Sequence, residues 1–149
     1  IVRAVVELLA MHREHDAIEY TALALGNVYG PRQRPDGGVV AAFAAAAANG
    51  EAPTLAGDGR QTRDFVFVDD VVDAMARAGT RGSGLVVNIG TGEQTPVRDV
   101  WTRVAGERAV TPLTGAPDDL PRFAVAPTRA RIHLGWAPWT TLDEGLAQL

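Results

Sequence analysis

An amide, an arginine and a glycine-rich turn follow one another along this chain, each beside a predicted strand. Asn27 comes directly after the first strand, Arg63 lies between a glycine turn and an apolar strand, and Gly90-Thr91-Gly92 follows a third strand. A guanidinium presents a planar fork of donors that matches a phosphate, and an amide can donate to a phosphate oxygen. Ligands of open α/β sheets sit beyond the carboxyl ends of the strands, so this order of residues suits the binding of a diphosphate.

Each of these residues also has a purely structural interpretation. Asn27 could support the turn, since Asn tolerates left-handed backbone and bonds to its own chain. Arg63 could pair with a nearby carboxylate instead of a ligand. The carboxylates in question are Asp64, Asp69 and Asp70. Gly90-Thr91-Gly92 fits a tight strand-to-helix turn better than a phosphate loop, because an isolated G-x-G motif carries little information.

Charge and residue content exclude several classes of function. The net charge of −4 argues against a general affinity for nucleic acid or for an anionic membrane surface. The chain has no Cys, which excludes disulfides and cysteine metal sites and agrees with a reducing cytoplasm, where we expect the protein. The three histidines lack the spacing of a metal site. The longest apolar run, residues 39–48, is far shorter than the ~20 residues of a membrane span.

The periodicity of apolar residues predicts alternating strands and helices. Helices are expected over 1–13, 39–48, 71–78 and 97–105, with shorter ones ending at 134 and starting at 142, and strands over 18–25, 54–55, 62–68 and 85–89. Residues 27–38 should form an irregular loop. Such alternation is typical of an α/β fold with a parallel sheet. Two strands of this kind make a poor sheet by themselves, so we expect them to be the last strands of a wider one.

Local signals set the expected helix ends. Asp69 and Thr128 are the expected N-caps of two helices, and Thr141 to Glu144 reads as a capping box. Asn49-Gly50 is a plausible C-terminal cap. The helix 39–48 has no polar face and should be buried. The first predicted helix has no N-cap, and the chain begins with Ile1, so we expect sequence to be missing upstream.

Four motifs in fixed order resemble the C-terminal half of NAD-dependent epimerase/dehydratases, which are extended short-chain dehydrogenases. The likeness is greatest to bacterial UDP-glucose 4-epimerases. The motifs are Asn27-Val28-Tyr29-Gly30-Pro31-Arg32-Gln33, Gly57-Asp58-Gly59 through Arg63-Asp64-Phe65 to Val68-Asp69-Asp70, Asn88-Ile89-Gly90-Thr91-Gly92, and Leu134-Gly135-Trp136-Ala137-Pro138.

The resemblance implies a fold and an activity. The fold would be the last strands of a Rossmann-like, doubly wound parallel sheet plus the small C-terminal substrate-binding domain. Residues 1–149 would form the nucleotide-sugar-binding part, without the N-terminal NAD-binding part. Such enzymes use bound NAD to oxidise and reduce the sugar, with a tyrosine base and a lysine four residues later. This chain has no lysine, so no residue is assigned a catalytic role and we expect it not to be catalytic by itself. The full-length protein would be a homodimer.

The same resemblance implies which residues contact the ligands. Asn27 and Arg63 match the diphosphate contacts, Gly38 and Val39 the loop against the nucleotide, Leu25 and Gly26 the backbone near the nicotinamide of NAD, and Asp119 an aspartate that reaches the ribose. Three positions depart from the family pattern. Ala56 replaces an aromatic residue, Pro127 an aspartate, and Ala116 an arginine that often precedes the Pro-Gly-Asp segment.

Two further interpretations remain open. The chain could be a non-catalytic remnant, or a module that uses the same fold for association. It could also complement a separately encoded partner that supplies the NAD-binding half.

Overall fold

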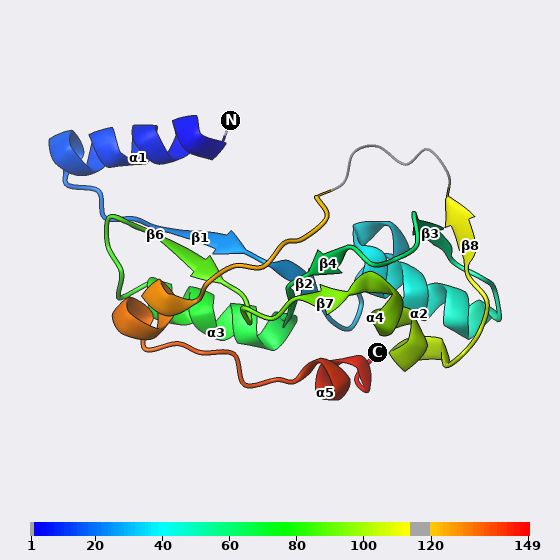
Figure 1. Cartoon of the computed structure of the whole chain (residues 1–149). Helices are drawn as coiled ribbons and strands as arrows, with labels where there is room; N and C mark the ends of the chain where they lie inside the picture. Colours follow the sequence, from blue (N-terminus) through cyan, green and yellow to red (C-terminus); the bar gives the residue numbers. More distant parts are fainter. Residues whose placement is uncertain (1, 114–119) are drawn as a thin grey trace.

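Short strands alternate with helices in the computed structural model, which describes residues 2–113 and 120–149 (Figure 1). The helices are α1 (Val2–Asp16), α2 (Val39–Asn49), α3 (Val68–Ala78), α4 (Val97–Ala105) and α5 (Leu142–Leu146), with a 3-10 turn η1 (Pro35–Gly37) and a π-helical turn η2 (Ala130–Leu134). The strands are β1 (Thr21–Leu25), β2 (Asn27–Tyr29), β3 (Thr54–Ala56), β4 (Thr62–Arg63), β5 (Phe65–Phe67), β6 (Leu85–Ile89), β7 (Thr95–Pro96) and β8 (Thr111–Leu113). The predicted α/β class is confirmed.

The strands pair two by two, mostly in parallel. β1 pairs with β6 and β2 with β5, so the first two strands, which follow one another in the chain, have different partners. β3 pairs in parallel with β8, and β4 pairs antiparallel with β7. The loop predicted for 27–38 therefore begins with a strand. Its residues gave no such signal, because the pairing with β5 is long-range.

The short strand β5 separates two hydrophobic cores. Successive side chains of a strand point to opposite faces. Phe65 and Phe67 accordingly belong to the core shared with α2 and α4, whereas Val66 belongs to the core shared with α3 and η2. All three are buried. The first core includes Phe43 packed edge-on against Trp101, with ring centroids 5.4 Å apart.

The helix ends confirm some of the predicted caps and correct others. Gly50 ends α2 in left-handed conformation, and Thr141 with Glu144 forms the capping box of α5, as predicted. α3 instead starts at Val68 with Phe67 as its N-cap, so Asp69 lies in the first turn. Arg129, not Thr128, precedes η2. α2 was expected to be buried, but it buries one side, including Val40, Ala41, Phe43 and Ala46. Its other positions are half-buried, or exposed at the last two residues.

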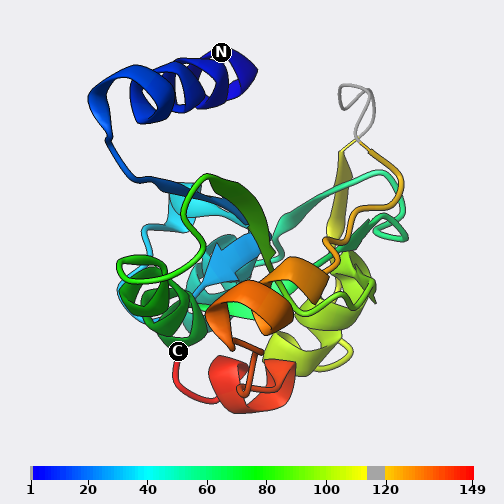
Figure 2. The ribbon, with the colours of Figure 1, turned by 90° about the vertical axis from the view of Figure 1, so that its left-hand side faces the viewer.

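α1 stands off from the rest of the chain (Figures 1 and 2). None of its described residues is buried, and its apolar side chains Val5 and Leu8 are each 51% exposed. β1 hydrogen-bonds to β6 on one side, and no strand among residues 2–113 and 120–149 pairs with its other edge. An unpaired strand edge with exposed apolar surface beside it is prone to pair with another chain.

We expect the purified chain to associate as its concentration rises, because α1 and the edge of β1 expose surface suited to burial. Sedimentation equilibrium should give a mean mass that increases with concentration. The double variant Val5→Glu/Leu8→Glu should shift the distribution toward monomer. His15→Glu adds charge at a polar, exposed position of the same helix and should behave like wild type. A wild-type mass that stays monomeric at all concentrations would contradict this expectation.

Candidate ligand-binding site

A cavity of about 300 Å³ lies between β2 and the start of α2. It brings together three of the residues that the sequence analysis assigned to the substrate, Asn27, Gly38 and Val39. The remaining lining residues are Val28, Gln33, Gly37, Val40 and Phe65. A residue with an amide side chain, the start of a helix and an aromatic residue therefore lie around one hollow.

Gly26 explains why Asn27 reaches this cavity. The Gly26 N–H still donates to the carbonyl of Ile89 in β6 at 2.8 Å, whereas the Asn27 N–H donates to the carbonyl of Asp64 at 2.7 Å. The chain thus changes neighbours between these two residues. A Cβ on Gly26 would lie 2.9 Å from the Asp64 carbonyl oxygen, so the crossing requires glycine.

The start of α2 offers backbone donors to the same cavity. Gly38 is the N-cap, with φ of 154°, and no side chain among the described residues caps the helix. The first N–H groups of a helix have no intrahelical partner, and the helix dipole favours negative charge there. Since Gly38, Val39 and Val40 line the cavity together with Asn27, the arrangement suits an anionic ligand.

Arg63 lies close to this cavity in the chain but is not one of its lining residues. Its guanidinium Nη1 donates to the carbonyl of Thr62 at 2.6 Å and to the carbonyl of Leu120 at 2.8 Å. The residue of this segment that lines the cavity is Phe65. The backbone of Arg63 lies close to Asn27, because the carbonyl of the next residue, Asp64, accepts the Asn27 N–H. The guanidinium of Arg63 is attached to the segment at Leu120.

The carboxylate of Asp64 is fully buried and accepts four hydrogen bonds. Oδ1 accepts from the backbone N–H and the hydroxyl of Thr91, at 2.8 and 2.6 Å. Oδ2 accepts from the N–H groups of Gly92 and Val125, at 2.9 and 3.1 Å. These bonds compensate the cost of burying a charge. They fix the turn after β6 against the start of β5.

The same bonds decide the role of Gly90-Thr91-Gly92. Its N–H groups at Thr91 and Gly92 are occupied by Asp64 and are not directed at a ligand phosphate. A Cβ on Gly90 would lie 2.6 Å from Asp64 Oδ2, so glycine is required for the close approach. The segment is a tight turn held by a buried carboxylate. The sequence suggests Asp64 only as a partner for Arg63, because the donors that reveal its role are distant in the chain.

Asp70 is a second fully buried carboxylate, in the first turn of α3. It accepts from the N–H of Thr140 at 3.2 Å and from its hydroxyl at 2.9 Å, which attaches the C-terminal segment to α3. Burial raises the pKa of Asp70, and the charge of Asp69 adds to the shift, while the hydrogen bonds from Thr140 and Trp139 oppose it. Asp64 and Asp70 are thus both engaged away from Arg63.

Tyr29 is buried in the first core. Burial raises the pKa of Tyr29 to about 12, and the negative charges of Asp70 and Asp143 contribute. Its hydroxyl donates to the carbonyl of Leu142 at 3.4 Å. A tyrosine that acts as general base near neutral pH needs the opposite shift of pKa. The position of Tyr29 is therefore that of a structural donor.

The remaining predicted site residues have separate locations. Leu25, 37% exposed, lies at the carboxyl end of β1, followed by Gly26 at the crossing. Asp119 lies outside the described residues. Among those residues there is no cluster of three or more His, Asp or Glu side chains that could hold a metal ion. No helix among them is both long and apolar enough to cross a bilayer.

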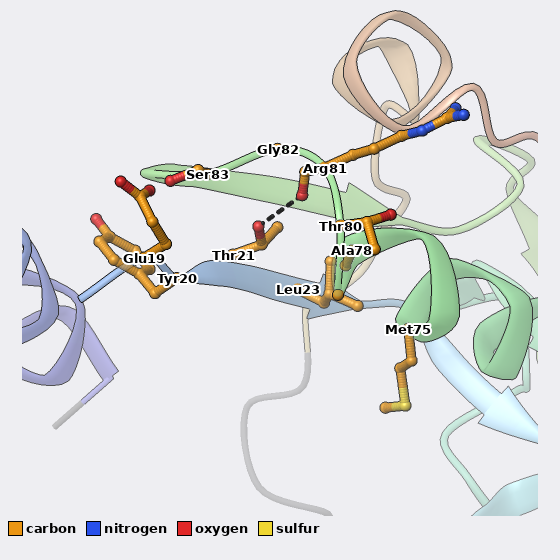
Figure 3. Close-up of a pocket in the computed structure, with 11 residues that line it drawn as sticks. Glu19, Tyr20, Thr21, Leu23, Met75, Ala78, Thr80, Arg81, Gly82 and Ser83 are labelled. Atoms are coloured by element: carbon orange, nitrogen blue, oxygen red, sulfur yellow. Dashed lines mark hydrogen bonds between the residues drawn. The ribbon is translucent and has the colours of Figure 1, made fainter. Parts of the chain in front are cut away.

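A larger hollow of about 610 Å³ lies between β1 and the end of α3 (Figure 3). Thr21 donates from its hydroxyl to the carbonyl of Arg81 at 2.9 Å across it. The charged side chains do not converge, since Glu19 and the Arg81 guanidinium extend away from each other in Figure 3. Met75 also points outward. Because this hollow adjoins β1 and lacks converging charged groups, the smaller cavity is the better candidate for a ligand site.

Residues 3–90 match the NAD dependent epimerase/dehydratase family. The chain therefore belongs to this family. The UDP-glucose 4-epimerase of Mycolicibacterium smegmatis is 44% identical over 153 residues, which cover 94% of this chain and 47% of that protein. The UDP-glucuronic acid decarboxylase 5 of Arabidopsis thaliana is 37% identical, covering 91% of this chain and 41% of that protein.

Solved structures give the same relationship. The UDP-glucose 4-epimerase of Thermotoga maritima, with UDP-glucose, has a TM-score of 0.91 at 35% identity, covering 97% of this chain and 48% of that chain. The UDP-glucose 4-epimerase of Thermus thermophilus, in complex with NAD, has a TM-score of 0.86 at 33% identity, covering 97% and 50%. The Rossmann-like epimerase fold is thus confirmed. The chain spans about half the length of these relatives, which fits the resemblance to a C-terminal half.

We expect Asp64→Asn to lower the free energy of unfolding by about 3 kcal/mol, because an amide NH₂ would then face N–H groups that it cannot serve. Urea denaturation at neutral pH measures the change. Asp58→Asn is the matched control, since Asp58 is exposed in a turn, and it should change stability by less than about 0.5 kcal/mol. A loss below about 1 kcal/mol for Asp64→Asn would show that the four bonds are not essential.

Asp70→Asn, unlike Asp64→Asn, should keep the hydrogen bonds of the wild-type side chain. An amide can accept from the Thr140 N–H and donate to its hydroxyl, so both bonds survive without a buried charge. Because the pKa of Asp70 is raised in the folded state, wild type loses stability as pH rises from the ordinary value of 3.8 through the folded pKa. Urea denaturation from about pH 3.5 to about pH 7.5 should show the variant gaining stability relative to wild type over that range. A constant difference at all pH values would contradict the assigned cause.

Proposed function

We propose that this chain is the nucleotide-sugar-binding half of an NAD-dependent sugar epimerase/dehydratase, with UDP-glucose 4-epimerase chemistry as the specific reaction. The proposal is supported by the family match and by relatives that are UDP-glucose 4-epimerases. In this proposal the chain binds and orients the substrate. The redox step takes place where a tyrosine base and NAD are supplied by sequence that this chain does not contain.

The cavity at Asn27 is the observation that carries the proposal. A diphosphate bridge has only hydrogen-bond acceptors at neutral pH. Asn27, Gly38 and Val39, which carry an amide side chain and the first N–H groups of a helix, line one hollow. Asn27 follows the carboxyl end of β1, and ligands of open α/β sheets bind beyond the carboxyl ends of strands.

Arg63 supplies the positive charge in this proposal. Its guanidinium lies beside the Leu120 carbonyl. A guanidinium carries five N–H donors in a fixed fork, so a contact with a phosphate is compatible with that bond. Asp119, which follows the family pattern for a ribose contact, is proposed to complete the nucleotide site.

NAD is the proposed cofactor, and it would accept a hydride from the sugar and return it. Leu25 fits a contact with the cofactor because it is partly exposed at the carboxyl end of β1. Gly26 follows it at the crossing, where the backbone carries no side chain. Leu25 and Gly26 are not part of the main NAD-binding loop of the family.

An association module with the same fold is the second candidate function. The exposed apolar residues of α1 and the unpaired edge of β1 favour it. A homodimer of the complete protein is compatible with the first proposal, whereas the second requires association without ligand binding. A ligand experiment therefore separates the two.

We expect UDP-glucose to raise the melting temperature of the wild-type chain and to give a saturable calorimetric titration, with NAD giving neither. The cavity that holds Asn27 lies within this chain, whereas the main cofactor loop does not. Stabilisation by NAD alone, or by neither compound, would contradict the proposed function and favour the association module.

Two variants locate the binding in the same titration. Asn27→Asp replaces a donor by a negative charge beside the diphosphate, and Arg63→Ala removes a charged hydrogen bond. Each should weaken UDP-glucose binding by about 1.5–3 kcal/mol. Arg60→Ala is the control, because Arg60 is exposed and pairs with Asp58 at 3.2 Å. Unchanged affinity in Arg63→Ala would show that Arg63 is structural.

A further inference from the structure

The carboxamide of Gln33 joins two walls of the ligand cavity. Its Nε2 donates to the carbonyl of Val28 at 3.3 Å and to the carbonyl of Gly37 at 3.0 Å. Val28 belongs to β2, and Gly37 ends the turn that leads into α2. All three residues line the cavity. One side chain therefore holds the strand that carries Asn27 against the loop before α2.

These two bonds fix the orientation of the carboxamide. Only the NH₂ end of a glutamine side chain can donate, and both neighbours at this end are carbonyl oxygens. The oxygen must therefore point the other way. Gln33 Oε1 is buried and has no hydrogen-bond partner among the residues that the structure describes. Buried acceptors normally have a donor, so this atom requires an explanation.

The loop that contacts the carboxamide is shaped to fit it. A Cβ on Gly37 would lie 3.2 Å from Gln33 Cγ, and a Cβ on Gly38 would lie 3.4 Å from Nε2. Gly38 also has a positive φ that side chains rarely adopt. Both glycines are exposed, whereas Oε1 is buried, so a ligand can reach Oε1 only if the surrounding chain shifts.

We propose that Gln33 is a specificity-determining residue whose Oε1 accepts a hydrogen bond from a hydroxyl or imide N–H of the bound nucleotide sugar. This inference rests on the proposed function. A diphosphate alone brings only acceptors, which suit Asn27 and the start of α2, and it would leave Oε1 without a partner. A nucleotide sugar brings acceptors and donors together, and so matches both the amide donor of Asn27 and the acceptor of Gln33.

Calorimetry with UDP-glucose tests the contribution of the side chain. Gln33→Met has similar length but neither donates nor accepts strongly through its tip, and it should weaken binding about tenfold or more. Gln148→Met makes the same change at an exposed glutamine whose amide reaches only the Glu144 carbonyl, at 3.5 Å. This control should change the affinity less than about twofold. Equal affinity of Gln33→Met and wild type would overturn the inference.

A spectroscopic measurement on wild type separates ligand contact from a structural role. The chain contains four Gln and three Asn, so its side-chain amide signals can be resolved and assigned by substitution. Saturation with UDP-glucose should shift the carboxamide carbon and NH₂ signals of Gln33, because Oε1 gains a donor. The Gln148 signals should not move. A Gln33 carboxamide that does not respond at saturation would overturn the inference even if Gln33→Met fails to fold.

Titration with UDP identifies the donor. A shift of the Gln33 signals with UDP alone assigns the donor to the nucleotide, and a shift only with UDP-glucose assigns it to the sugar. Either result supports the inference. Failure of wild type to bind either compound would overturn the proposed function and this inference together. Binding with a silent Gln33 would overturn this inference alone.

Discussion

The buried carboxylate of Asp64 is the interaction on which the rest of the site depends. It has no counter-charge among its four donors, and backbone N–H groups with one hydroxyl satisfy it instead. Such a carboxylate is stable only when all of these donors stay in place, so it fixes three chain segments relative to one another. Its own backbone carbonyl then receives the Asn27 N–H. The position of the candidate ligand amide is therefore a consequence of a satisfied charge in the interior.

The crossing at Gly26 determines where Asn27 lies relative to the candidate cavity. A strand that continued beside β6 would end at the sheet edge without reaching α2. Because the chain moves from β6 to β5 within two residues, Asn27 is carried toward the start of α2. The donors of the cavity thus come from a strand and a helix, both of which are packed in the first core. Sites built on such elements hold their geometry better than sites on loops alone.

Local patterns in the sequence predicted the elements, and long-range contacts determined the site. The apolar run at 85–89 and the periodicity at 97–105 gave β6 and α4 with their bounds, because burial of those residues follows from pattern alone. The strand β2 was missed, since Asn27 to Tyr29 lies in a region rich in glycine and proline and its partner β5 is distant in the chain. The role of Asp64 was missed for the same reason, as its donors are up to 61 residues away. Resemblance to a family placed Asn27, Gly38 and Val39 together, and residue spacing could not have done so.

The side chains of β5 alternate between the two hydrophobic cores, so this one strand belongs to both. Phe65 and Phe67 support the cavity from one face of the strand, while Val66 faces the core beneath β6 and α3. Among residues 2–113 and 120–149, β1 pairs only with β6, so one edge of β1 is open. β1 continues through Gly26 directly into Asn27, and Val28 both lines the candidate cavity and packs against the second core. A polypeptide that pairs with the open edge of β1 would therefore act on the candidate cavity through only a few residues of backbone.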